Sequence, residues 1–336
     1  MTGPVVQPPA GARLVSTGSV VADLPLYVPQ LPPRGGDVLA TTPGTVAGGG
    51  FNVVAAAARH GAAVALASPV GTGPHGTLVR EALTREGVEL VVPAAAGETG
   101  LVVTLVEPDG ERTFVTTVGV EGRPRAEDLA AVAVRPGDVV YVSGYDLTYP
   151  GAGVVAAWAA GLPAGVRLLV DPGPLAGEIA AELLGAVLAR CDVLTINAHE
   201  AATLAANGDA GARPDTEAGP ADLTALRARV PPGCAVLVRV GAAGCWVSEA
   251  AGAAAVLVPS TPVRPVDSTG AGDTHTGVLA AGLLAGRPLV ETVRRANVAA
   301  ALSVLRPGPA TAPTAAELDA HLLRGPTGEA RRAPRA

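Results

Sequence analysis

The sequence predicts an α/β protein with a mainly parallel central sheet that is covered by helices on both faces. Helical stretches alternate with short apolar stretches along most of the chain, which is typical of β-α-β units. These apolar stretches are continuous, as expected for strands that are buried on both faces of a sheet. Two regions interrupt the alternation and predict additional strands. The predicted fold class is therefore a three-layer α/β/α sandwich with a small β-strand lid.

The expected elements follow one another from the first strand onward. Residues 12–21 predict that strand, and residues 50–71 predict a helix, a glycine stop and a buried strand. The same alternation continues through five further stretches: 78–90, 138–145, 156–173, 179–206 and 223–241. Residues 264–286 then lead through a glycine turn into a helix. Ligands of such sheets bind at the carboxyl ends of the strands, so the loops that follow strands are the places to search for a site.

The lid is predicted at two places, about residues 24–46 and 99–119. Both regions look extended and turn-linked, and the sequence EPDGER at 107–112 is a strong hairpin signal. We expect these strands to be inserted into one domain that spans residues 12–324. The Pro/Gly-rich residues 1–11 and the charged residues 325–336 predict flexible tails.

Composition excludes several classes of function. The net charge of −6 and the pI near 5.4 argue against binding to nucleic acid. No stretch of about 20 unbroken apolar residues predicts a membrane span, and the N-terminus lacks the pattern of a signal peptide. The three scattered cysteines, Cys191, Cys234 and Cys245, fit a reducing compartment. We therefore expect a cytoplasmic protein.

The absence of lysine is more informative, because all 24 basic residues are arginine. A phosphate-binding P-loop, a Schiff base and a protein-kinase strand lysine all require a lysine amine. The sequence excludes these mechanisms.

The strongest candidate for chemistry is the segment Gly270–Ala271–Gly272–Asp273. Glycines before a helix let backbone N–H groups converge, and the helix N-terminus adds a partial positive charge, so the segment predicts an anion hole. A carboxylate beside a bound phosphate is useful as a general base, which contributes roughly 10²–10⁴ in rate. The alternative is that Asp273 only caps the helix.

Further polar residues follow other predicted strands. Asp23 follows the first strand, and the sequence AGGGFN places Asn52 after a run of glycines, where both suit the binding of hydroxyl groups. Asn197 and Glu200 follow the strand in TINAHE, with a spacing suited to waters around a phosphate-bound Mg²⁺. Alternatively, Asp23 is only a turn residue and the glycines before Asn52 only start a helix. Asn197 and Glu200 would then form only a helix capping box.

Four of these motifs together resemble the PfkB, or ribokinase-like, family of sugar and nucleoside kinases. AGGGFNVVAAAARHGAAVALASPVG resembles its first signature and VDSTGAGDTHTG its second. NAHE resembles the N-x-x-E motif, and VRVGAAGC resembles the T-x-G-x-x-G strand-turn of the nucleotide site. The resemblance runs from about residue 13 to 322, and it is closest to the YegV-like sugar kinases.

This resemblance implies an ATP-dependent kinase with a role for each matched position. Asp273 is expected to deprotonate a primary hydroxyl of a sugar or nucleoside, with the backbone of Gly270, Ala271 and Gly272 as the anion hole. Sugar binding is expected at Asp23, Gly48, Gly49 and Asn52, and nucleotide binding at Asn197, Glu200, Arg239, Gly241, Gly244 and Asn297. Glu200 is expected to hold Mg²⁺ through water, and Asp267, Thr269 and Gly308 fall where some members bind K⁺. The lid is expected to form a homodimer interface.

The chain also departs from the family pattern. Val21 and Gly49 stand where ribokinases have Asn and Lys, which argues against ribose. Arg239 replaces the usual Thr, where it is expected either to reach a phosphate or to lie on the surface. His275 replaces the usual Phe and is expected to pack, with a role as a second acid–base group as the alternative. A nucleoside kinase, a sugar-binding regulatory protein without turnover, and a phosphosugar kinase that uses Arg34, Arg112 or Arg123 remain as alternatives.

Overall fold

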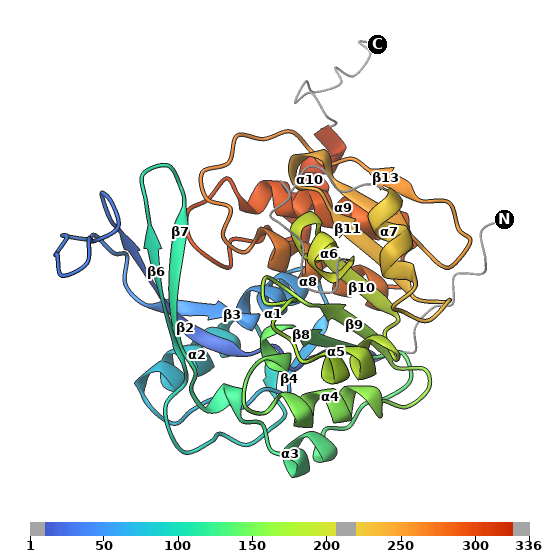
Figure 1. The fold of residues 1–336 in the computed structure, drawn as a ribbon, viewed down its shortest axis with the longest axis horizontal. Coiled ribbons are helices and arrows are strands. Elements are labelled where there is room, and N and C mark those ends of the chain that lie inside the picture. Colours follow the sequence, from blue (N-terminus) through green and yellow to red (C-terminus); the bar gives the residue numbers. More distant parts are fainter. Residues whose placement is uncertain (1–10, 206–219, 325–336) are drawn as a thin grey trace, which may run out of the picture.

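The computed structural model describes residues 11–205 and 220–324 and confirms the predicted α/β/α sandwich (Figure 1). In this part of the chain the central sheet has nine strands. Their order is β13 (Val256–Val258), β12 (Cys245–Ser248), β11 (Ala235–Arg239), β10 (Val193–Asn197), β9 (Arg167–Asp171), β8 (Val139–Ser143), β1 (Arg13–Ser16), β4 (Ala63–Leu66) and β5 (Glu89–Leu90). Neighbours from β11 to β5 are parallel, whereas β12 and β13 are antiparallel additions at one edge.

Helices cover both faces of this sheet. One layer contains α1 (Gly50–Arg59), α2 (Pro74–Arg85), α8 (Ala271–Leu284), α9 (Leu289–Ser303) and α10 (Ala315–Arg324). The other contains α3 (Ala126–Ala131), α4 (Ala152–Ala160), α5 (Ala181–Leu188), α6 (Ala198–Ala205) and α7 (Pro220–Arg227). Successive side chains of a strand point to opposite faces, so Leu14 of β1 joins the first core and Val15 the second.

Four further strands form the lid, which stands beside the main sheet at the left of Figure 1. Their order is β3 (Val46–Gly49), β2 (Val20–Tyr27), β6 (Leu101–Val106) and β7 (Arg112–Thr117). Strands β6 and β7 pair antiparallel across the EPDGER turn, which confirms the predicted hairpin. Strand β2 pairs parallel with β6 and antiparallel with β3.

Two expectations about the strands need correction. Residues 12–21 do not form one strand, because the chain leaves the main sheet after Ser16 and enters the lid sheet at Val20. The first lid region is mostly not strand either: between β2 and β3 the structure has one isolated bridge, from Tyr27 to Thr41. The tails expected at 1–11 and 325–336 lie outside the described residues, except for Gly11.

Among the helices of the described ranges, none has the length and apolar character needed to cross a membrane.

Candidate active site

Helix α8 begins at the glycine turn that the sequence singled out. Gly270 occupies the N-cap position with a left-handed φ of 73°, and Asp273 lies in the first turn of the helix. The amide of Ala271 donates to the carbonyl oxygen of Ser268 at 3.3 Å. The next two amides, of Gly272 and Asp273, have no backbone acceptor within the described part of the chain. These two N–H groups at a helix N-terminus are suited to bind an anion.

Asp273 is held by a residue from a different helix. Asn52 lies in the first turn of α1, and its Nδ2 donates to Oδ2 of Asp273 at 2.8 Å. Oδ1 of Asn52 is buried and has no hydrogen-bond partner in the described ranges. Burial raises the pKa of Asp273 to about 6, the hydrogen bond from Asn52 lowers it, and the nearby charge of Asp171 raises it. The carboxylate is therefore a stronger base than an exposed aspartate.

The glycines before α1 are required for close packing of the chain. A Cβ atom on Gly50 would lie 2.4 Å from the carbonyl oxygen of Gly18, and one on Gly48 would lie 2.9 Å from Cβ of Asp23. Gly49 has a φ of 60°. The backbone thus passes close to the start of the lid, and only glycine fits there.

Asp23 lies on the lid strand β2 and is almost fully buried. Its Oδ1 accepts a hydrogen bond from Oγ1 of Thr104, on the neighbouring strand β6, at 2.8 Å. Burial raises the pKa of Asp23, the Thr104 hydrogen bond lowers it, and the charge of Asp267 raises it. The carboxylate is thus held against the neighbouring lid strand.

A cleft of about 490 Å³ is lined in part by Ala271 and Gly272 of the anion hole. It includes five of the six residues expected to bind the nucleotide: Asn197, Arg239, Gly241, Gly244 and Asn297. Gly272, His275 and the lid residue Arg112 line it too. Burial lowers the pKa of His275 to about 3, so the imidazole is neutral at physiological pH and supplies no proton. The volume is typical of a small-molecule site.

Glu200, the sixth expected residue, lies behind Asn197 in a capping box. The amide of Asn197 donates to Glu200 Oε2 and the amide of Glu200 to Asn197 Oδ1, both at 2.8 Å. This is the capping pattern that the sequence left open as the alternative. No group of three carboxylate, histidine or cysteine side chains in the described chain is arranged to hold a metal ion. The expectation that Glu200 holds a phosphate-bound Mg²⁺ through water stays a prediction.

Arg239 is buried in an ion-pair cluster and does not lie on the surface. Its Nη1 is 2.7 Å from Asp171 Oδ2, and its Nη2 is 3.6 Å from Glu200 Oε2. Nη1 also donates to the hydroxyls of Thr195 and Thr276. Burial opposes the charge on Arg239, but Asp171 and Glu200 outweigh this effect and raise the pKa of the guanidinium. The guanidinium lies 3.7 Å from the position of a Cβ on Gly272, beside the anion hole.

Asp267, Thr269 and Gly308 do lie together, as expected. Oδ1 of Asp267 accepts from the amide and the hydroxyl of Thr269, and its Oδ2 accepts from the amide of Gly308 at 2.8 Å. Arg112 places a guanidinium nitrogen 3.6 Å from Oδ1. Both carboxylate oxygens accept hydrogen bonds and a guanidinium lies beside them, so a potassium ion here would have to share these oxygens and lie close to a positive charge.

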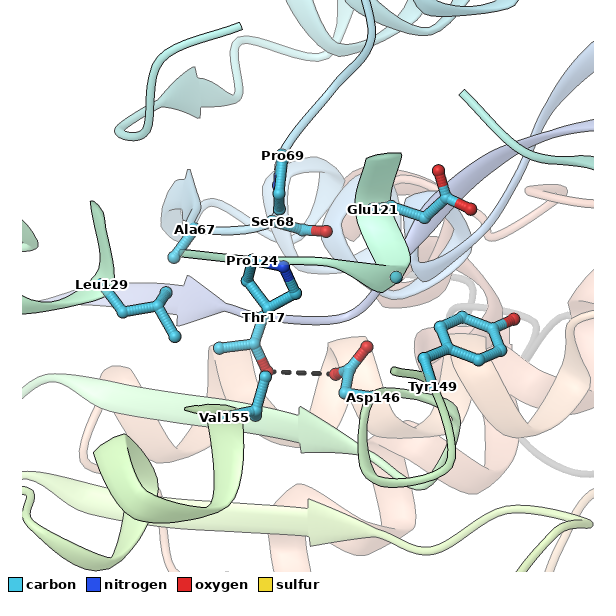
Figure 2. A pocket seen from close by; sticks show the side chains of 11 residues that line it. Thr17, Ala67, Ser68, Pro69, Glu121, Pro124, Leu129, Asp146, Tyr149 and Val155 are labelled. Atoms are coloured by element: carbon cyan, nitrogen blue, oxygen red, sulfur yellow. Dashed lines mark hydrogen bonds between the residues drawn. The ribbon is translucent and has the colours of Figure 1, made fainter. Parts of the chain in front are cut away.

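A second, very small cavity lies near the turn between β1 and β2 (Figure 2). Its volume of about 10 Å³ holds at most one water molecule. Asp146 lines it and accepts hydrogen bonds from Thr17 Oγ1 at 3.0 Å and Ser19 Oγ at 2.8 Å. Burial raises the pKa of Asp146 to about 6. This carboxylate holds the turn from the main sheet to the lid and is too enclosed to meet a substrate.

Sequence reasoning missed two features of this site. Asp171, at the end of β9, was not singled out, although a strand-ending aspartate before Pro172 in a sheet of this class was a usable signal. The contact between Arg112 and the loop before α8 was missed because 157 residues separate Arg112 from Thr269 and no local pattern links them.

The chain is similar to several known proteins. The sequence profile described as pfkB family carbohydrate kinase matches residues 12–316. The uncharacterized sugar kinase YegV of Escherichia coli (strain K12) is 33% identical over 306 residues, 90% of this chain and 91% of YegV. Ribokinase of Bacillus subtilis (strain 168) is 30% identical over 291 residues, 85% of this chain and 91% of that protein. The structure of Arabidopsis thaliana ribokinase complexed with ribose and ATP has a TM-score of 0.73 at 24% identity, over 94% of this chain and 99% of that chain.

Proposed function

The chain belongs to the pfkB family of carbohydrate kinases, phosphotransferases with an alcohol group as acceptor, and we propose that it transfers the γ-phosphate of ATP to a primary hydroxyl of a small sugar. One observation carries the proposal. Asp273, with its raised pKa and its hydrogen bond from Asn52, lies beside two helix N-terminal amides that have no backbone acceptor in the described chain. A base and an anion site are adjacent, as phosphoryl transfer requires.

In the proposed reaction Asp273 accepts the proton of the sugar hydroxyl. The oxygen attacks the γ-phosphorus, the bond from that phosphorus to the β-γ bridging oxygen breaks, and ADP leaves with the electron pair. The amides of Gly272 and Asp273 stabilise the negative charge on the transferred group, helped by the helix N-terminus. Mg²⁺, carried on the ATP phosphates, would neutralise their charge.

The nucleotide is proposed to occupy the 490 Å³ cleft. Gly241 has a φ of 56°, and a Cβ on Gly244 would lie 2.1 Å from the carbonyl oxygen of Val258, so this turn keeps its path only with glycine. Asn297 donates to the same carbonyl oxygen at 2.8 Å and so ties α9 to this turn. The volume of the cleft is sufficient for a base and a ribose.

The sugar is proposed to bind on the lid side of Asp273. The buried Oδ1 of Asn52 needs a hydroxyl donor, since an unpaired buried carbonyl oxygen is costly. Asp23 on β2 offers a carboxylate next to the paired strand β3, which contains Gly48 and Gly49. Closure of the lid over this side would exclude water and protect ATP from hydrolysis.

The lid is also proposed to pair with the lid of a second copy. Phe114 and Val115 on β7 are more than half exposed, which is unusual for large apolar side chains on a sheet.

The test is ADP release with ATP and Mg²⁺ across a panel of sugars, sugar acids, phosphosugars and nucleosides. We expect a sugar-dependent rate. The variant Asp273→Asn is expected to lose about 10²–10⁴-fold in kcat with little change in KM for ATP, because an amide accepts no proton.

If the wild type releases no ADP with any compound of the panel but sugars still raise its melting temperature, the protein is better explained as a binding protein without turnover. If only nucleosides support ADP release, the substrate is a nucleoside and not a sugar. Near wild-type turnover of Asp273→Asn would remove Asp273 from the role of base.

A further inference from the structure

The side chain of Arg112 joins the lid to the loop before α8. Arg112 is the first residue of β7, and its guanidinium lies on the loop Asp267–Thr269. Nη1 donates to Oγ1 of Thr269 at 2.7 Å, and Nη2 donates to Oγ of Ser268 at 2.9 Å. Nη1 is also 3.6 Å from Oδ1 of Asp267. Three consecutive loop residues are thus held by one residue of the lid.

This loop determines where the anion hole lies. Gly270 follows it directly in the left-handed conformation, and the carbonyl oxygen of Ser268 accepts the amide of Ala271. Asp267 joins the loop to the chain after α9 through the amide of Gly308. A shift of Ser268 or Thr269 would therefore move the first turn of α8, which carries Gly272 and Asp273.

The loop also carries a negative charge close to this guanidinium. Asp267 is only partly exposed, and its charge raises the pKa of the nearby, buried Asp23. Burial acts to raise the pKa of Asp267 itself, but hydrogen bonds from Thr269 and Gly308 and the charge of Arg112 lower it below its usual value. Arg112 therefore offsets part of the negative charge of Asp267.

We propose that Arg112 is a positioning residue that orders the anion hole from the lid and supplies the positive charge that a monovalent cation would otherwise bring to Asp267. The proposal rests on the proposed function and deepens it. A potassium ion beside Asp267 would lie close to the guanidinium, which would repel it, and would compete with three hydrogen bonds for the carboxylate oxygens. The order of the anion hole then depends on the contact between the lid and this loop.

The experiment compares the wild type with Arg112→Ala, Arg112→Lys and the control Arg85→Ala, an exposed arginine at the end of α2. kcat and KM for ATP are measured by ADP release, with tetramethylammonium or K⁺ as the monovalent cation. Hydrogen–deuterium exchange of the 266–274 segment is measured in parallel, without substrates. The exchange readout does not depend on turnover.

We expect wild-type kcat to change less than about twofold between the two cations. Arg112→Ala should lower kcat by about 10- to 100-fold, the effect of losing hydrogen bonds from a charged group, with KM for ATP nearly unchanged. Its 266–274 segment should exchange faster. Arg112→Lys keeps the charge and should recover part of kcat, and Arg85→Ala should match the wild type.

Several results would overturn the proposal. Strong activation of the wild type by K⁺ would show that Arg112 does not replace a cation, and so would an Arg112→Lys variant no better than Arg112→Ala. A rise in KM for ATP at constant kcat would make Arg112 a nucleotide contact instead. If the wild type releases no ADP on any substrate, the proposed function fails by itself. Exchange of the 266–274 segment in Arg112→Ala then decides this inference, and unchanged exchange rejects it.

Discussion

Asp273 illustrates how neighbours set the strength of a single carboxylate. Burial removes the water that stabilises its charge, and the carboxylate of Asp171 opposes that charge further. Asn52 and Arg239 act in the opposite direction, through a hydrogen bond and a positive charge. The outcome is a pKa of about 6, which is close enough to neutral pH for the group to take up a proton in catalysis.

The first prediction is a pH profile. A general base works as an anion, so activity is present above its pKa and falls as protons occupy it. We expect kcat/KM of the free enzyme to fall about tenfold per pH unit below about 6, since burial raises the pKa of Asp273 to about 6.

The variant Asn52→Leu tests the cause. It removes the hydrogen bond that lowers the pKa of Asp273, so the acid limb of the profile should move to higher pH. A limb near the ordinary aspartate pKa of about 4 in the wild type would contradict the assignment.

At the scale of elements, α8 is the helix on which the site is built, and it owes its position to small residues. Residues Thr274 to Leu284 are all buried, between α1 and α9. A Cβ on Gly277 would lie 2.4 Å from the carbonyl oxygen of Val53, and one on Gly282 would lie 2.3 Å from Cγ2 of Thr292. Glycine lets α1 approach closely enough for Asn52 to reach Asp273.

The second prediction concerns that approach. Gly277→Ala should destabilise the protein by about 1–3 kcal/mol, because the new methyl group overlaps the backbone of α1 and forces the helices apart. It should also lower kcat, because Asn52 and Asp273 lie on the two separated helices. Urea unfolding and ADP release measure the two effects.

Gly185→Ala on α5 is the matched control. Nothing lies within 4 Å of a Cβ at this position, so alanine should stabilise the protein by about 0.5–1 kcal/mol through helix propensity. Equal effects of the two substitutions would show that the α1–α8 contact is not tightly packed.

At the scale of the whole molecule, the carboxyl ends of three adjacent strands meet at Arg239. Asp171 ends β9, Thr195 lies near the end of β10, and Arg239 ends β11. Thr276 joins them from α8 and also donates to Asp171 at 3.1 Å. The cluster ties the sheet to the helix that carries Asp273, so the site and the core are held by the same contacts.

The third prediction follows from this cluster. Arg239→Ala should lower the free energy of unfolding by about 3–5 kcal/mol, because it leaves Asp171 buried without its charge partner. Arg294→Ala is the control: Arg294 forms an exposed i,i+3 ion pair with Glu291, and its loss should cost about 0.5 kcal/mol or less. Similar losses for both variants in urea unfolding would mean that the buried pair contributes no more than a surface pair.

The alternation of helices and apolar strands was sufficient to predict the sandwich, and EPDGER was sufficient to predict the lid hairpin, because both patterns are local in the chain. The glycine turn at Gly270 was visible for the same reason. Only the tertiary structure decided that residues 12–21 divide between two sheets, since main-sheet strand and lid strand have the same apolar character. It alone brought Arg112 to Thr269 and Arg239 to Asp171. Those contacts depend on which strand ends lie side by side. Residues so far apart in the chain form no local sequence pattern from which the contact could be predicted.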